Sequence, residues 1–175
     1  MRSKRGPLLA AAIVTLAACG RESAQPSTPA GVVAATGIDF AHVANYAAPP
    51  LPAYFDETVA ALDNSPASNP VDDRVATLGR VLFHDLRLST NNRASCATCH
   101  QQRFGFTDPM RFSNGISTAG TTDFHAMRLG NLRYWQPGTT FWDRRAANAE
   151  AQASHPLHSL IEMGWGKRAG GIEAL

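Results

Sequence analysis

Cys96-Ala97-Thr98-Cys99-His100 is the most specific pattern in this chain of 175 residues. In a Cys-x-x-Cys-His motif, two thiols one helical turn apart can each add to a vinyl group of a haem, and the adjacent histidine can bind the iron. A redox dithiol needs no histidine there and belongs to a βαβ unit, which this sequence does not show. A zinc site needs four ligands, and no second cysteine pair follows. The motif therefore predicts one covalent haem c, held by Cys96 and Cys99, with His100 on its iron.

The N-terminus has the pattern of an export signal. Basic residues at positions 2, 4 and 5 precede an apolar stretch, residues 7–18, that is too short to span a bilayer. The stretch runs into Leu-Ala-Ala-Cys-Gly at 16–20, which resembles the lipobox of bacterial lipoproteins, where cleavage leaves a lipidated cysteine at the new N-terminus. An ordinary cleaved signal with a chance cysteine is the alternative. We therefore expect a lipoprotein signal peptide at 1–18, lipid on Cys19, and a periplasmic location, either lipid-anchored or soluble.

Cysteine count and charge restrict the other possibilities. The chain has three cysteines, so none remains for a disulfide if Cys19 carries lipid and the other two carry haem. The formal net charge of +2 includes the basic residues of the signal, which leaves the mature chain closer to neutral. We therefore expect no nucleic-acid partner, and contact with a membrane through the lipid anchor only.

Composition divides the rest of the chain into a tether and a domain. Residues 19–50 are rich in Ala, Pro, Ser, Thr and Gly, which is typical of a flexible tether. Residues 51–175 form the predicted domain, in which 101–140 are dense in Gly, Thr, Asn and Pro and predict long loops. No strand pattern of useful length occurs, so the predicted fold class is all-α with large loops.

Two helices are expected in this domain. Apolar residues recur at three- and four-residue steps from Asp72 to Leu86 and predict a helix that delivers the chain to the haem motif. A second helix is expected from Asp143, acting as N-cap, to about Ser154, before Pro156 stops it.

Several further motifs surround the haem motif in a fixed order: Leu78-Gly79-Arg80, Leu82-Phe83, Asp85, Arg87-Leu88-Ser89, Gly105-Phe106-Thr107-Asp108, Phe141-Trp142-Asp143, Arg145-Ala146, Gln152 and Glu162-Met163. Together they resemble the bacterial di-haem cytochrome c peroxidase family, which also contains the MauG-like proteins. The resemblance covers roughly 78–164 and implies a cytochrome c-like haem domain, the N-terminal domain of that family, in which hydrogen peroxide is reduced.

The resemblance implies a role for five residues. His100 becomes the proximal ligand, which supports peroxide chemistry by donating electron density to the iron. Glu162 matches the distal carboxylate that moves a proton between the two peroxide oxygens, and Gln152 matches the amide that orients the peroxide. Trp142 matches a tryptophan that helps electrons pass between two haems, and Arg145 is expected to pair with a haem propionate. Without the resemblance, Glu162 would be an exposed carboxylate at a helix end, and Gln152 would be a solvated helix residue.

The sequence also departs from the family. A histidine on the family's distal loop caps the resting iron, but the corresponding residues 113–120 contain none. His125 lies slightly later, and it is a possible distal ligand, another distal-pocket residue or a satisfied surface histidine. Calcium is not supported, because the family's asparagine ligand falls near Met127. The family's second haem has its own motif, which this chain lacks, so we expect a truncated product that is weak or inactive; a true one-haem protein is the alternative.

The leading functional hypothesis is a cytochrome c peroxidase that reduces hydrogen peroxide with electrons from a small donor protein, a cytochrome c or a cupredoxin. The first alternative is a mono-haem electron carrier, with Met163 as sixth ligand and Met110 or Met127 as weaker candidates. The second alternative is a MauG-like oxidase of protein side chains.

Overall fold

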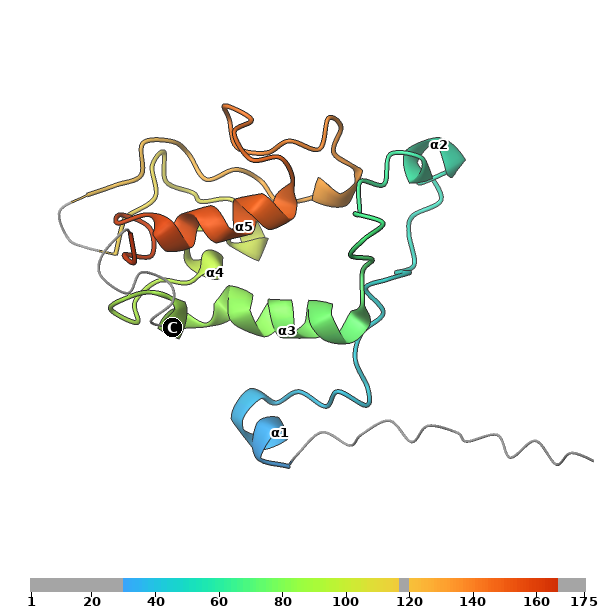
Figure 1. Ribbon diagram of the computed structural model, residues 1–175, viewed down its shortest axis with the longest axis horizontal. Helices are drawn as coiled ribbons and strands as arrows, with labels where there is room; N and C mark the ends of the chain where they lie inside the picture. Colours follow the sequence, from blue (N-terminus) through green and yellow to red (C-terminus); the bar gives the residue numbers. More distant parts are fainter. Residues whose placement is uncertain (1–29, 117–119, 167–175) are drawn as a thin grey trace, which may run out of the picture.

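The computed structural model describes residues 30–116 and 120–166 (Figure 1). Regular structure in these two ranges is helical, with isolated β-bridges and no longer strand. The predicted signal peptide, the predicted lipidation site Cys19 and the beginning of the predicted tether lie outside the described residues. The helices, in chain order, are α1 (Ala30–Thr36), α2 (Glu57–Ala60), α3 (Asp73–His84), η1 (Leu86–Leu88), α4 (Cys96–Cys99), η2 (Gln102–Phe104), η3 (Leu132–Tyr134) and α5 (Ala149–His158).

Helix α3 confirms the first predicted helix. The Asp72 carboxylate accepts hydrogen bonds from the backbone N–H groups of Arg74 and Val75, each at 2.9 Å, and so caps the first turn. The helix ends at His84 and packs against α4, the single turn formed by Cys96–Cys99. The predicted arrangement, a helix that leads the chain to the haem motif, is therefore present.

Residues before α3 are attached to the domain at two points. The Asp73 carboxylate accepts hydrogen bonds from the backbone N–H groups of Tyr46 (2.6 Å) and Ala47 (2.8 Å). Further along, Asp63 forms an ion pair with Arg133, with 2.7 Å between Oδ2 and Nη2. These contacts join the chain leading into α3 to the helix and to the region of η3.

Helix α5 differs from the predicted second helix at both ends. It begins after Asn148, whose side-chain oxygen accepts the N–H of the residue three positions later at 2.8 Å, and not at Asp143. The preceding residues form a turn in which Phe141 and Arg144 have left-handed backbone angles, φ 68° and 57°, which a helix cannot contain. Pro156 does not stop the helix, because it lies in the last turn before the end at His158.

The interior of the described part of the chain is small and polar. Its buried hydrophobic residues are Ala94, Ala146 and Met163. Buried polar residues outnumber them in the same ranges, and hydrogen bonds of their side chains hold several loops in place. These polar residues are Thr77, Ser89, Ser95, Asp108, Ser113 and Thr140.

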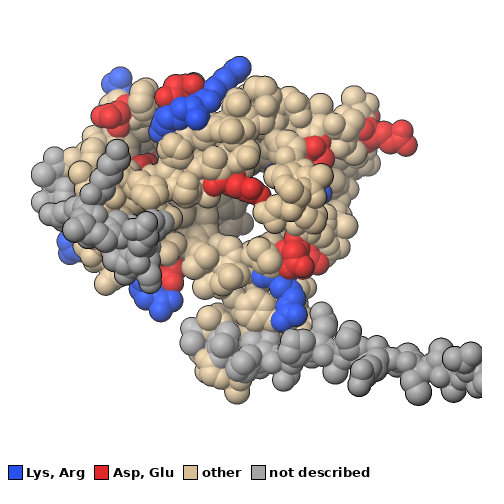
Figure 2. Space-filling view, in the orientation of Figure 1, with Lys and Arg blue, Asp and Glu red and all other residues tan. Residues whose placement is uncertain are grey.

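The surface of the described residues carries both exposed apolar and charged side chains. Within 30–116 and 120–166, no helix is long and apolar enough to cross a membrane. On the face shown in Figure 2, acidic and basic side chains of the described residues are interspersed over an otherwise uncharged surface.

Candidate functional site

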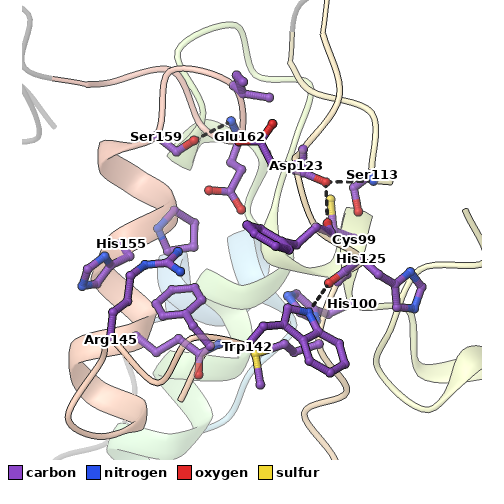
Figure 3. A pocket seen from close by; sticks show the side chains of 18 of the residues that line it. Cys99, His100, Ser113, Asp123, His125, Trp142, Arg145, His155, Ser159 and Glu162 are labelled. Atoms are coloured by element: carbon purple, nitrogen blue, oxygen red, sulfur yellow. Dashed lines mark hydrogen bonds between the residues drawn. The ribbon is translucent and has the colours of Figure 1, made fainter. Parts of the chain in front are cut away.

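A cavity of about 540 Å³ lies between α4, α5 and the loops that join them (Figure 3). It gathers residues that are up to 63 positions apart in the sequence. Seven of the site residues expected from the sequence line it: Cys99, His100, His125, Trp142, Arg145, Gln152 and Glu162. Cys96 is not part of the lining but stands one helical turn before Cys99 in α4.

Hydrogen bonds before α4 position the two cysteines. The backbone N–H of Ser95 donates to the Thr98 hydroxyl at 3.0 Å and closes the first turn. The buried hydroxyl of Ser89 accepts the backbone N–H groups of residues 93 and 94, each at 3.1 Å, and thereby folds the preceding loop. Cys96 and Cys99 are both half-buried and both free thiols, one turn apart.

The environment of the two thiols is unlike that of a redox dithiol. Burial raises the pKa of the Cys96 thiol. Burial also raises the pKa of the Cys99 thiol, and the nearby carboxylates of Asp108 and Glu162 add to this effect. Reactive dithiols have a lowered thiol pKa, because the thiolate is the nucleophile. The cysteines therefore fit a structural attachment role better than a thiol–disulfide exchange role.

His100 is oriented to present one ring nitrogen. Its Nδ1 lies 3.0 Å from the carbonyl oxygen of Phe106, and since a carbonyl only accepts, Nδ1 is the donor. The Nε2 atom is then the nitrogen with a free lone pair. The accepting loop is closed by a bridge between Gln101 and Thr107, and Gly105 turns it with φ 70°. A carbonyl partner of this kind is typical of metal-binding histidines.

Glu162 and Met163 face different surroundings, although they are neighbours. Glu162 lines the cavity, and Figure 3 shows its carboxylate directed into it, while its backbone N–H donates to the hydroxyl of Ser159 at 3.2 Å. Met163 is buried, 4% exposed, and is not part of the lining. Of the methionines considered as sixth ligand, Met127 lines the cavity and Met110 does not. The geometry therefore favours a carboxylate over the Met163 thioether at this position.

Gln152 supplies an unpartnered polar atom. It is on α5 and lines the cavity, and its Oε1 is buried without a hydrogen-bond partner. Nearly all buried polar atoms in proteins are paired, so an unpaired one beside a cavity is suited to a bound polar group. This is the property expected of an amide that orients a ligand.

Trp142 and Arg145 lie on the turn before α5. The indole N–H of Trp142 donates to the carbonyl oxygen of His125 at 2.9 Å, and the ring is 62% exposed. The Arg145 guanidinium donates to Asp143 at 2.9 Å and lies 3.7 Å from the centre of the Phe141 ring. A propionate would therefore share Arg145 with Asp143.

Both ring nitrogens of His125 have hydrogen-bond partners. Nδ1 lies 2.9 Å from the carbonyl oxygen of Met110, and Nε2 lies 2.9 Å from the hydroxyl of Thr107, which also contacts the carbonyl of Ala126. Binding of iron by His125 would require the ring to leave at least one of these partners. Its role as a distal ligand stays a prediction.

Two residues that were not predicted from the sequence as part of the site also line the cavity. His155 and His158 line the cavity from α5, and the ring of His155 meets the edge of Phe141 at 5.2 Å between centres. These histidines follow Gln152 at three-residue steps, the spacing of one helix face. Continuing the helix beyond Pro156 would have identified them from the sequence.

The residues present fit a covalent haem. Two free thiols stand one turn apart, the adjacent histidine keeps Nε2 for a metal, and the orphaned Gln152 oxygen and the Glu162 carboxylate line the same cavity. Thiols at this spacing next to a histidine are the donor set of c-type haem attachment.

Comparisons with known proteins agree with this donor set. The sequence model of the family "Di-haem cytochrome c peroxidase" matches residues 73–175. The chain is 33% identical over 131 residues to the methylamine utilization protein MauG of Paracoccus denitrificans, which covers 63% of this chain and 33% of that protein. It is 36% identical over 98 residues to the cytochrome c peroxidase Ccp of Escherichia coli, covering 56% of this chain and 20% of that one.

A solved structure gives the same result. The crystal structure of a MauG-like protein associated with microbial copper homeostasis matches with a TM-score of 0.52 and 36% identity, covering 59% of this chain and 32% of that chain. The chain thus spans a third or less of the length of these relatives.

Proposed function

Since the chain belongs to the di-haem cytochrome c peroxidase family, whose members carry c-type haem, we propose that it reduces hydrogen peroxide to water with two electrons from a small donor protein. The observation that carries this proposal is the shared cavity of Gln152, Glu162 and His100. An electron carrier needs no carboxylate and no unpaired amide oxygen beside its haem.

In this proposal, the proximal side of the site would hold the cofactor. Cys96 and Cys99 would form its thioether bonds, and Nε2 of His100 would bind its iron while Phe106 keeps the ring in one orientation. The haem supplies a metal that binds peroxide and passes electrons to it. A cytochrome c-like arrangement with one haem in this chain is part of the proposal.

The distal side would handle protons. The Glu162 carboxylate accepts the proton of the near peroxide oxygen and returns it to the far oxygen, which then leaves as water. The Gln152 Oε1 accepts a hydrogen bond from the peroxide and aligns it without adding charge. Two electrons and two protons complete the conversion of one peroxide to two waters.

The edges of the cavity would serve electron entry and cofactor binding. Trp142 is exposed at the edge of the cavity, and its indole N–H donates to the carbonyl oxygen of His125. Because the ring is accessible, it would accept electrons from the donor protein. Arg145 would neutralise a propionate. A periplasmic location, the lipid on Cys19, and a cytochrome c or cupredoxin as the donor are part of the same proposal.

A MauG-like oxidase of protein side chains is the second candidate. It is favoured by the relatives that carry the name MauG and by the MauG-like crystal structure. The two candidate functions differ in the source of their electrons. A peroxidase takes them from a reduced donor protein, whereas an oxidase of protein side chains does not.

The decisive experiment uses the full chain with haem attached, and compares Glu162→Gln with Glu150→Gln. Glu150 is the matched control, because it is a carboxylate in the first turn of α5, is exposed, and accepts a hydrogen bond from Asn69 outside the cavity. We expect Glu162→Gln to lower the rate of donor-dependent peroxide reduction by about 100-fold or more, and Glu150→Gln to leave it unchanged. A low-spin haem unreactive toward peroxide in the unaltered protein would contradict the proposal.

A further inference from the structure

The segment that carries Glu162 is held at both ends. One residue before the carboxylate, the carbonyl of Ile161 accepts the backbone N–H of Ile116 at 2.9 Å. One residue after it, the carbonyl of Met163 accepts the backbone N–H of Thr90, also at 2.9 Å. The position of Glu162 is therefore fixed by chain segments more than 40 residues away, in addition to the local hydrogen bond from its backbone N–H to Ser159.

Glycines allow this close approach. Gly164 has φ 89°, and a Cβ atom there would collide with the side chains of Thr90 and Ile116. A Cβ atom on Gly115 would lie 2.8 Å from the carbonyl oxygen of Ile161. The segment after α5 is thus packed directly against the two segments to which it bonds.

One side chain adds a third link. The indole N–H of Trp165 donates to the carbonyl of Leu88 at 2.8 Å, two residues before Thr90. Trp165 is half-buried and does not line the cavity, so it does not touch a bound ligand. It is the link of the three that a substitution can remove, because the other two join backbone atoms.

The partner segment, 88–90, also supports the proximal side. Its central residue, Ser89, accepts the N–H groups that fold the loop leading into Cys96. The same three residues therefore contact the chain before the haem motif and the chain around the distal carboxylate.

We propose that Trp165 is a positioning residue that, through Leu88, fixes where the Glu162 carboxylate lies relative to His100. This inference rests on the proposed peroxidase function. A displacement of about 1 Å in a catalytic group can cost up to about 100-fold in rate, so loss of this link is expected to act on turnover.

The test replaces one N–H while keeping an aromatic ring. Trp165→Phe is compared with Trp135→Phe, because Trp135 makes the same kind of bond, from its indole N–H to the carbonyl of Thr139 at 2.9 Å, and is not part of the cavity lining. In the haem-loaded full chain, we expect Trp165→Phe to lower the turnover number per haem by roughly tenfold or more and to alter the pH–rate profile. The KM for the donor should not change, and Trp135→Phe should match the unaltered protein.

Two further variants separate the possible failures. If Glu162→Gln leaves peroxide reduction intact, the proposed function itself is wrong. If Glu162→Gln abolishes it but Trp165→Phe keeps both turnover and pH profile, the positioning role is wrong. If Trp165→Phe carries no haem, Gly164→Ala displaces the same segment by crowding Thr90, and an unchanged turnover number in that variant overturns the proposal.

Discussion

The Nδ1 atom of His100 donates to the carbonyl oxygen of Phe106 at 3.0 Å, and this bond determines which ring nitrogen is available to a metal. The covalent and the coordinating functions of the motif are thereby assigned to different atoms. Attachment depends on two sulfurs, and coordination depends on Nε2 alone.

This division predicts that the two functions can be lost separately. His100→Gly should retain covalently bound haem, because Cys96 and Cys99 remain, but should lose the nitrogen ligand and change the visible and spin-resonance spectra. Added imidazole should restore the original spectrum by occupying the vacated position. Cys96→Ala with Cys99→Ala should lose covalent haem, measured after denaturation. Covalent haem in that double variant would contradict the assignment.

Replacing Gln152 is expected to lower the rate of peroxide reduction without lowering the stability of the fold. Gln152→Leu removes a buried oxygen that has no partner, so the free energy of unfolding should stay the same or rise by up to about 1 kcal/mol. Peroxide reduction should fall by about tenfold or more, because the peroxide loses its hydrogen-bond acceptor.

The control for Gln152 is Gln136→Leu, since Gln136 is exposed and donates to the carbonyl of Leu62 away from the cavity. Thermal unfolding and peroxide kinetics measured on both variants check the prediction. A Gln152→Leu variant that is as active as the original would remove the amide from the mechanism.

His125 is expected to matter more for the loops than for the iron. Its ring joins Met110 to Thr107, so His125→Phe should lower the free energy of unfolding by about 1–3 kcal/mol through the loss of both hydrogen bonds. The resting spin state of the haem should stay the same. If the variant becomes high-spin while the original is low-spin, His125 is the distal cap.

The Asp63–Arg133 pair predicts a pH-dependent contribution to stability. The hydrogen bond from Arg133 lowers the pKa of the Asp63 carboxyl from 3.8 to about 2. Since the folded pKa is lowered, the contribution is fully present above about pH 4 and disappears as the pH falls toward 2. Both side chains are about 30% exposed, so the contribution should be about 1 kcal/mol or less.

A double-mutant cycle with Asp63→Asn and Arg133→Gln, measured by denaturant unfolding between pH 7 and pH 2.5, isolates this term. The coupling energy should be constant from pH 7 to 5 and decline below pH 4. A coupling energy that does not change with pH would contradict it.

The regular helices were only partly predictable from the sequence. The capping aspartate and the apolar spacing after it located α3 correctly, because both signals act within one turn. The start of α5 was misplaced, because Asp143 looks like a cap, whereas the left-handed residues Phe141 and Arg144 direct the chain into a turn first. Periodicity contains no information about such backbone angles.

The candidate site was also only partly predictable from the sequence. Local spacing located Cys96, Cys99 and His100, and family resemblance located Gln152 and Glu162, all of which the structure places in or beside one cavity. The hydrogen bonds of His125 join segments 15 to 18 residues apart, and no local pattern reveals them. The link from Trp165 to Leu88 spans 77 residues and depends on the fold as a whole.

Ser89 has a consequence for how variants of this protein are interpreted. Its buried hydroxyl supports the chain before the cysteines, and its neighbours on both sides bond to the chain around Glu162. A random mutation at position 89 would lower both haem incorporation and turnover. A mutational screen for activity would therefore not distinguish it from a mutation in the Cys-x-x-Cys-His motif. Genetic data alone would therefore place residue 89 among the haem ligands, although it does not line the cavity.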